Sequence, residues 1–508
     1  MNLDDVHAMP RPAPLAALAL AFASIATPAR AGLTLDGLTG PVTAAEIASF
    51  KATMAATAPL STGGGNWMSD GDDGRDLEAF GQMYEITGDV AFLDRMIDFI
   101  EPILAARNDP KTGRVMWTGL RDLVWITKDA TVFNAGYAGS EQGDALGHIA
   151  YAANLILRTP ALWSVIVPDG NPHGWGVTYL DRAKAFVSEC EKTEDSYLVK
   201  WFVDPTTHRF TPPALATWTA MDENVTAWNR QMMFDEAFLR LADAHALLGD
   251  APDKVTSYRL IAKTSVEWFL SEVHANKTAY SWSYGPSEYP KDIEYNEGIH
   301  AVYDIIGLWN AYASCALGIT TDQLKPFAST AVDVLSLGPG TNQFHSYVDG
   351  TGPILKDMWD AGWVYLTAAD ARVFETVAGA AVAAGRATSK MDDFAAILWV
   401  KNAIDKKSFP SCAATGATGD AGIPPTDGGA VLDAGAGPDS STASGDAGGI
   451  VDAAAPESDA AIVARDSGTA ATTDATGGCD VSNRSSRGNS AWLVVASALG
   501  FARRRARS

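Results

Sequence analysis

Apolar residues recur at helical spacing, every three to four positions, through most of residues 40–405. The pattern predicts twelve helices, near 43–57, 75–87, 91–107, 141–158, 178–200, 230–248, 254–274, 298–317, 321–336, 353–368, 371–385 and 391–405. Period-two alternation typical of strands is not a feature of these segments, so the chain is predicted to be all-α.

Two of the predicted helix–helix connections are alike. At Gly88-Asp89, and again at Gly249-Asp250, a glycine ends one helix and an aspartate can cap the start of the next. Repeated helical hairpins of this kind suggest a closed ring in which each hairpin supplies one inner and one outer helix.

Aromatic residues gather in the segments between the predicted helices, at 66–73, 116–118, 218–228 and 280–284. Aromatic faces stack on sugar rings, and carboxylates and amides bind hydroxyl groups, so these loops fit a sugar-binding cleft. The alternative is that most of the fifteen tryptophans fill a large core.

Three segments carry a resemblance to a known superfamily: Trp67 with Asp72-Asp73-Gly74-Arg75 and Tyr84–Asp89, then Trp228-Asn229-Arg230, then Tyr295–Asp304. With these segments the chain resembles the six-hairpin, (α/α)6-toroid carbohydrate-active enzymes, which include glycoside hydrolases, polysaccharide lyases and uronyl epimerases. The resemblance covers the pattern of nearly all of 40–405, and no motif is a unique fingerprint. It implies sugar chemistry in a central cleft and leaves the reaction open.

The segment Tyr295–Asp304 is the first candidate site. Asn296 suits a helix N-cap, and His300 would share a helix face with Asp304, which could orient its imidazole. The candidate catalytic residues here are Glu297, His300 and Tyr303, and the candidate substrate-binding residues are Tyr295 and Asn296. Lyases and epimerases of this general fold use such residues to remove a proton beside a carboxylate. The alternative is a capped helix with a structural histidine.

Asp72 and Asp73 form the second candidate catalytic pair, since glycoside hydrolysis needs two carboxylates. Together with Asp70 and Asp76 they could instead cap the following helix, or bind Ca²⁺ through oxygen ligands. The spacing is not that of an EF-hand, so no metal is predicted.

Further substrate-binding candidates are Trp67, Asn229, Arg230 and Trp282. Arg230 could clamp a carboxylate with two hydrogen bonds, or could pair with Asp235 or Glu236 on its own helix. Lesser candidates are Tyr137, Glu141, His148, His345 and Tyr347.

The two ends of the chain read as export and anchoring signals. Residues 1–31 combine an apolar run with an Ala29-Arg30-Ala31 cleavage site, so they are predicted to be a secretory signal peptide. Residues 411–478 contain no aromatic residue and no lysine, and are predicted to be a disordered, acidic stalk between the domain at 32–410 and the tail.

The tail, 479–508, joins Cys479 to a short apolar run at 491–502 and a terminal arginine cluster. The run is shorter than the roughly 20 residues of a stable membrane span. The tail resembles the C-terminal sorting tails of myxobacterial surface proteins, which implies handling by export and sorting machinery and display on the outer surface of a Gram-negative cell. The alternative is a weak amphipathic helix.

Charge and cysteine content narrow the function further. The formal charge is −23; the stalk carries −9 and the tail +5, which leaves −19 on residues 32–410. So acidic a surface argues against nucleic acid and anionic membranes as partners. The four cysteines lack zinc spacing, and one disulfide among Cys190, Cys315 and Cys412 is expected of an exported protein. No nucleotide or nucleophile-elbow motif occurs, so no cofactor is predicted.

Three functional hypotheses remain open. A hydrolase of neutral glycans fits the acidic domain and its carboxylates, whereas a uronate lyase or epimerase fits Asn296, His300 and Tyr303 together with Arg230. A non-catalytic, glycan-binding or adhesive surface protein is the third, and the stalk and tail suit it. In all three the expected partner is a polysaccharide.

Overall fold

The structure is a computed structural model that describes residues 32–59, 72–126, 136, 138–139, 141–213, 226–288, 298–356 and 361–412, without the side chains of residues 72, 73, 298 and 299. All of these residues belong to one compact unit, Met1–Asp420. The predicted signal peptide, almost all of the predicted stalk and the predicted tail lie outside the described residues. None of the described helices has the length and apolar character needed to cross a membrane.

The described part of the chain is rich in helix, which confirms the all-α prediction in outline. The α-helices are α1 (Ala44–Ala56), α2 (Asp72–Thr87), α3 (Ala91–Ala105), α4 (Gln142–Leu157), α5 (Tyr179–Thr193), α6 (Lys200–Phe202), α8 (Trp228–Leu248), α9 (Pro252–Glu272), α10 (Gly298–Ala313), α11 (Thr321–Ser329), α12 (Arg372–Ala383) and α13 (Met391–Lys406). Short 3-10 and π segments complete them: η3 (Pro160–Leu162), η4 (Glu194–Val199), η5 (Thr330–Leu335), η6 (Ala361–Ala368) and η7 (Arg386–Thr388).

Strands are few and short in the described residues. Strand β1 (His274–Asn276) pairs antiparallel with β2 (Ala279–Ser281), and β3 (Phe344–His345) pairs antiparallel with β4 (Ile354–Leu355). The second pair corrects the helix predicted at 353–368. The described residues of that segment begin with β4, beside the turn at Gly350 and Gly352, which both have positive φ, and end with the 3-10 helix η6.

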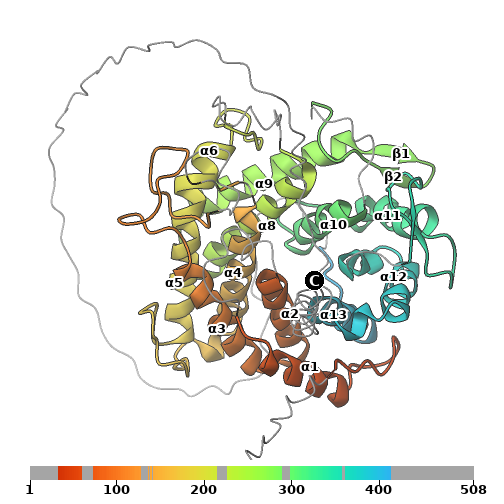
Figure 1. Cartoon of the computed structure of the whole chain (residues 1–508), viewed down its shortest axis with the longest axis horizontal. Coiled ribbons are helices and arrows are strands. Elements are labelled where there is room, and N and C mark those ends of the chain that lie inside the picture. The colour runs from red at the N-terminus through yellow and green to blue at the C-terminus, as the bar shows by residue number, and fades with distance from the viewer. Residues whose placement is uncertain are drawn as a thin grey trace, which may run out of the picture. The chain divides into compact units, whose positions relative to one another are not determined.

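Six elements pack against one another in a closed order: α2 on α4, α4 on α8, α8 on α10, α10 on η6, η6 on α13, and α13 on α2. We call these six the inner elements (Figure 1). Asn154 on α4 donates to the Arg240 carbonyl on α8 at 2.9 Å, and both residues lie equally far from the start of their helices. Near the start of both helices Gly143 on α4 approaches Met233 on α8, so the contacts advance along both helices together and the two run in the same direction.

The remaining helices pack on this set. Helix α3 lies against α2, α5 against α4, α9 against α8, and α12 against η6. The buried side chains between them form a continuous core in which Phe50 lies between Phe80, Phe92 and Phe394 from three different helices. The first and last helices of the described chain thus share one core.

Helix α4 is buried along its whole length, and two of its glycines allow the close approach of α8. A Cβ atom on Gly143 would lie 2.8 Å from the backbone oxygen of Met233, and one on Gly147 would lie 2.7 Å from the side chain of Glu236. Because backbone cannot move aside cheaply, larger residues here would separate the two helices. These glycines bring the charged side chains of α4 and α8 together.

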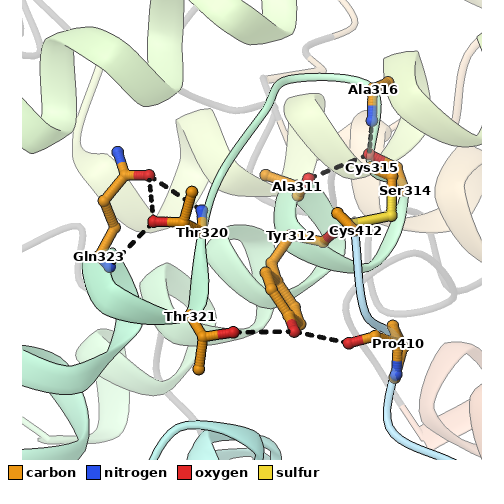
Figure 2. Close-up of a disulfide and its surroundings, with 10 residues drawn as sticks. All are labelled: Ala311, Tyr312, Ser314, Cys315, Ala316, Thr320, Thr321, Gln323, Pro410 and Cys412. Carbon is orange, nitrogen blue, oxygen red and sulfur yellow. Dashed lines mark hydrogen bonds between the residues drawn. A yellow bond between two sulfur atoms is a disulfide. The ribbon is translucent and has the colours of Figure 1, made fainter. Parts of the chain in front are cut away.

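The cysteine pairing left open by the sequence is Cys315 with Cys412, whose Cα atoms are 5.3 Å apart, while Cys190 is buried and free. The disulfide ties the segment after α13 to the end of α10, where Tyr312 donates a 2.5 Å hydrogen bond to the Pro410 carbonyl (Figure 2). We call residues 407–412 the strap.

Removing this disulfide is expected to lower the free energy of unfolding by about 2–5 kcal/mol, because the bridge closes a long loop in the unfolded chain. The two cysteines are separated by 97 positions. Urea unfolding of the Cys315→Ser/Cys412→Ser protein measures the loss. A reductant should destabilise the unsubstituted protein and leave the double variant unchanged; equal stability of both proteins would contradict the prediction.

Candidate active site

The inner elements enclose a cavity of about 230 Å³. All six contribute side chains to its wall, and many of these side chains are polar or charged. Buried charges are expensive unless they are paired, so a cavity of this kind marks a candidate functional site.

Five charged side chains from three inner helices meet at the middle of the cavity: Glu78, Asp144, His148, Glu236 and Arg240. His148 Nδ1 lies 3.1 Å from Glu78 Oε2 and 3.9 Å from Glu236 Oε1, and its Nε2 lies 3.5 Å from Asp144 Oδ1. Arg240 donates to Glu78 at 3.0 Å and also pairs with Glu236. We call these five residues the central cluster.

The environment shifts the pKa values of Glu78 and Glu236 in opposite directions. Burial acts to raise the pKa of Glu78, but Arg240 and His148 outweigh it and lower that pKa to about 2. For Glu236 burial is the larger effect, and its pKa is raised. Three carboxylates face two cations here, so one carboxyl group retains a proton most readily, and Glu236 is that group.

His148 is held in its protonated form. Burial acts to lower its pKa, but Glu236, Asp144 and Glu78 surround the ring and raise the pKa to about 10. At neutral pH the cluster therefore combines an ionised Glu78 and a cationic His148 with Glu236, whose pKa is shifted upward by burial. Carboxyl groups whose pKa values differ in this way are typical of sites that carry out acid–base catalysis.

The ligand atoms of Glu78, His148 and Glu236 lie within 4.8 Å of one another, a spacing that could hold a metal ion. Arg240 already bridges both carboxylates, so a cation would have to displace its guanidinium. His148 would also have to lose its proton to act as a ligand. The arrangement therefore favours proton transfer.

Glu85 lies two helical turns beyond Glu78 on α2 and also lines the cavity. Its Oε2 accepts a 2.6 Å hydrogen bond from Trp399 Nε1. Glu85 is an exposed residue, yet partial loss of solvent around its carboxyl group raises the pKa of that group. Glu85 is a second potential proton donor, closer to the α2 C-terminus.

Tyr303, predicted to be catalytic, lines the cavity near its other end. Its hydroxyl accepts a 2.6 Å hydrogen bond from Arg75, whose other nitrogen lies 3.5 Å from Asp392. Arg75 carries part of the resemblance described above, and it lines the same cavity as the central cluster.

His300 and Arg230, both predicted site residues, influence each other outside the cavity wall. Burial and the positive charge of Arg230 lower the pKa of His300 to about 4, so the imidazole is neutral at neutral pH. The ring packs edge-on against Tyr284, with centroids 4.9 Å apart. The sequence suggested Asp235 or Glu236 as a partner of Arg230. In the structure Asp235 accepts a hydrogen bond from Ser265 at 2.7 Å, and Glu236 belongs to the central cluster.

Two predicted substrate-binding residues are buried in the core. Trp282 is fully buried, packs on Phe269 and donates to Asp304 at 2.8 Å. This placement corrects its assignment to a binding loop, because no face of the ring reaches solvent. Asn229 is also buried, and its side-chain amide finds no hydrogen-bond partner among the residues that the structure describes.

The structure does not describe the side chains of the other predicted site residues. Trp67, Tyr295, Asn296 and Glu297 lie outside the described residues. Asp72 and Asp73 lie in the first turn of α2, but their side chains are not described. Whether these residues meet at one cleft stays a prediction.

Of the five residues in the central cluster, only His148 was a candidate site residue from the sequence, and a lesser one. The available signal was a set of charged pairs four residues apart within largely apolar helices: Asp144 with His148, and Glu236 with Arg240. Such pairs are also common on exposed helix faces, so spacing alone cannot separate the two cases.

The raised pKa of His148 predicts a pH dependence of stability. A histidine with a folded pKa near 10 and an unfolded pKa near 6.5 stabilises the fold fully below about pH 6.5, and this stabilisation is lost as the pH rises to about 10. The free energy of unfolding should therefore fall between pH 7 and 10, and His148→Gln should flatten that slope. Urea unfolding across this range measures it, with the exposed His274→Gln as control. An unchanged slope in His148→Gln would refute the assignment.

No family model and no curated protein matches the chain. Among solved structures it is similar to a cellobiose 2-epimerase from Bacillus thermoamylovorans, with 10% identity over 70% of this chain and 79% of that chain and a TM-score of 0.36. It is also similar to a sugar epimerase from a ruminal bacterium, with 13% identity over 66% and 87% and a TM-score of 0.39. Likeness at this level is distant, and no inference about activity rests on it.

Proposed function

We propose that this protein is a carbohydrate-active enzyme that processes a glycan in the cavity between its inner elements, with glycoside hydrolysis the best-supported reaction. The observation that carries the proposal is the central cluster, in which two carboxyl groups face one cavity: Glu78, whose pKa is lowered by Arg240 and His148, and Glu236, whose pKa is raised by burial. The closed order of six inner elements supports the (α/α)6-toroid hypothesis as its framework.

In this mechanism Glu236 donates its proton to the glycosidic oxygen as the bond to the anomeric carbon breaks. Glu78 attacks that carbon as the nucleophile, and a water molecule, deprotonated by Glu236, then releases the sugar. The ligand atoms of the two residues lie within 4.8 Å of each other. This spacing is nearer to the roughly 5–5.5 Å of retaining enzymes than to the wider gap of inverting ones.

A screen of the purified protein against neutral and uronate-containing polysaccharides tests the proposal. New reducing ends, without ultraviolet absorbance from an unsaturated uronate, are the expected result. Proton NMR of the first product should show a retained anomeric configuration. If no saccharide is turned over, while glycans are retained on an array, the protein is a binding protein and the proposal fails.

Uronate lyase or epimerase activity is the second candidate, and one observation favours it. His300 is neutral and half-buried, and the charge of Arg230 acts on it, so a base and a carboxylate-binding group are close together. Absorbance rising together with reducing ends would establish a lyase. A change of sugar configuration without chain cleavage would establish an epimerase.

Secretion and surface anchoring are part of the same proposal. They rest on the signal-peptide and tail patterns at 1–31 and 479–508. Deleting residues 491–508 should release the protein from the cell surface into the medium, measured by surface labelling of intact cells. Undiminished surface display of the truncated protein would exclude the tail as the anchor.

A further inference from the structure

One end of the cavity holds buried amide groups that lack partners. Gln82 is 4% exposed and lines the cavity; its Nε2 donates to the Tyr365 hydroxyl at 2.5 Å, but its Oε1 has no hydrogen-bond partner among the described residues. Asn310 is a half-buried residue that lines the same cavity, and its buried Nδ2 likewise finds no partner in the described part of the chain. Leaving such an atom without a partner destabilises the fold. The pair offers one acceptor and one donor to a ligand in the cavity.

Aromatic rings lie beside these amides. Trp309 stacks on Tyr365, with centroids 5.4 Å apart and planes 10° apart, and Trp399 packs edge-on against both rings. All three rings line the cavity. Aromatic surface next to amide groups is the combination that recognises a pyranose, which has apolar C–H faces and a rim of hydroxyls.

The strap completes the wall at this end. Pro410 lines the cavity, and the disulfide to Cys315 together with the hydrogen bond from Tyr312 fixes its position (Figure 2). Phe409, also in the strap, packs edge-on against Trp399 with centroids 6.3 Å apart. The strap therefore forms part of the cavity wall and packs against the Trp399 ring.

The cations at this end and in the neighbouring central cluster already face carboxylates. Arg158 lies 3.7 Å from Asp243, Arg240 pairs with Glu78 and Glu236, and the Glu85 carboxylate faces the cavity. An acidic sugar would be repelled by these carboxylates, and the two described cations beside them, Arg158 and Arg240, already face carboxylates. The site thus favours a neutral ligand.

We propose that Gln82, Asn310 and Trp399, with the strap, form a subsite for one neutral pyranose ring, a proposal that rests on the glycan-processing function above. Gln82 lies one helical turn, about 6 Å, beyond Glu78. A ring bound there places the adjoining glycosidic bond near the central cluster. The cavity of about 230 Å³ is smaller than the roughly 300–1,000 Å³ typical of drug-sized ligands, so it accommodates one or two rings.

The test is binding to the full chain, measured by calorimetry and by protection of tryptophan fluorescence from acrylamide quenching. The probes are neutral hexoses and disaccharides, and uronic acids of the same size. A neutral disaccharide is expected to bind and uronic acids are not. Gln82→Met and Asn310→Leu should each weaken binding by about tenfold, because each removes a hydrogen bond in a desolvated site.

The control is Asn402→Leu. Asn402 is a half-buried amide on α13 that does not line the cavity, so this variant should bind like the unsubstituted protein. Asn310→Leu keeps the test decisive if Gln82→Met does not fold. Uronic acids binding more tightly than neutral sugars, no neutral sugar binding, or unchanged affinity in both variants would each overturn the subsite. Binding with these variant effects but without turnover would instead refute only the proposed enzyme activity.

Discussion

Glu236→Gln is expected to lower kcat by about 10²–10⁴-fold, the usual effect of losing a general acid. The substitution keeps the shape of the side chain and removes the proton that Glu236 would donate. Because three carboxylates share two cations in the central cluster, removing one of them should leave the melting temperature nearly unchanged or raised. Initial rates and thermal melts of the same preparation measure both effects.

Glu78→Gln should lose turnover to a similar degree but should also destabilise the fold. Glu78 accepts from both Arg240 and His148, so the amide would leave two buried cations short of a partner. Glu267→Gln, an exposed glutamate paired with Lys263, is the matched control and should change neither quantity. Full activity in both cluster variants would remove Glu78 and Glu236 from the mechanism.

The helices could be predicted from the sequence because their apolar spacing is set by the core they bury. The predicted segments at 43–57 and 391–405 match α1 and α13 within about a residue. The segment 353–368 failed because its apolar content resembles a helix, whereas the turn at Gly350 and Gly352 starts a strand pair. Local periodicity carries no information about such a tertiary pairing.

The site was harder to predict, because its side chains come from helices distant in sequence. Glu78, His148 and Glu236 are separate, unremarkable charges until α2, α4 and α8 pack together. Loops such as 280–284 attracted attention through their aromatic content, yet Trp282 belongs to the core. Function therefore depends here on a polar inner surface that only the packing of the inner elements creates.

The second large effect concerns stability and involves two residues that do not line the cavity. Lys401 on α13 donates to Glu46 on α1 at 2.8 Å, and the two side chains are 2% and 0% exposed. Glu46 also forms the capping box of α1 with Thr43, so the buried pair joins the first and last described helices through a helix cap.

Lys401→Met should therefore lower the free energy of unfolding by about 3–5 kcal/mol, because it leaves the Glu46 carboxylate buried without a compensating charge. Lys401→Met/Glu46→Gln should recover much of this loss, since a neutral amide can keep the cap hydrogen bonds. Urea unfolding of both single variants and the double variant completes the cycle. A loss below about 1 kcal/mol in Lys401→Met would mean that the pair behaves like an exposed one, and the join between α1 and α13 would then rest on apolar contacts such as Phe50 with Phe394.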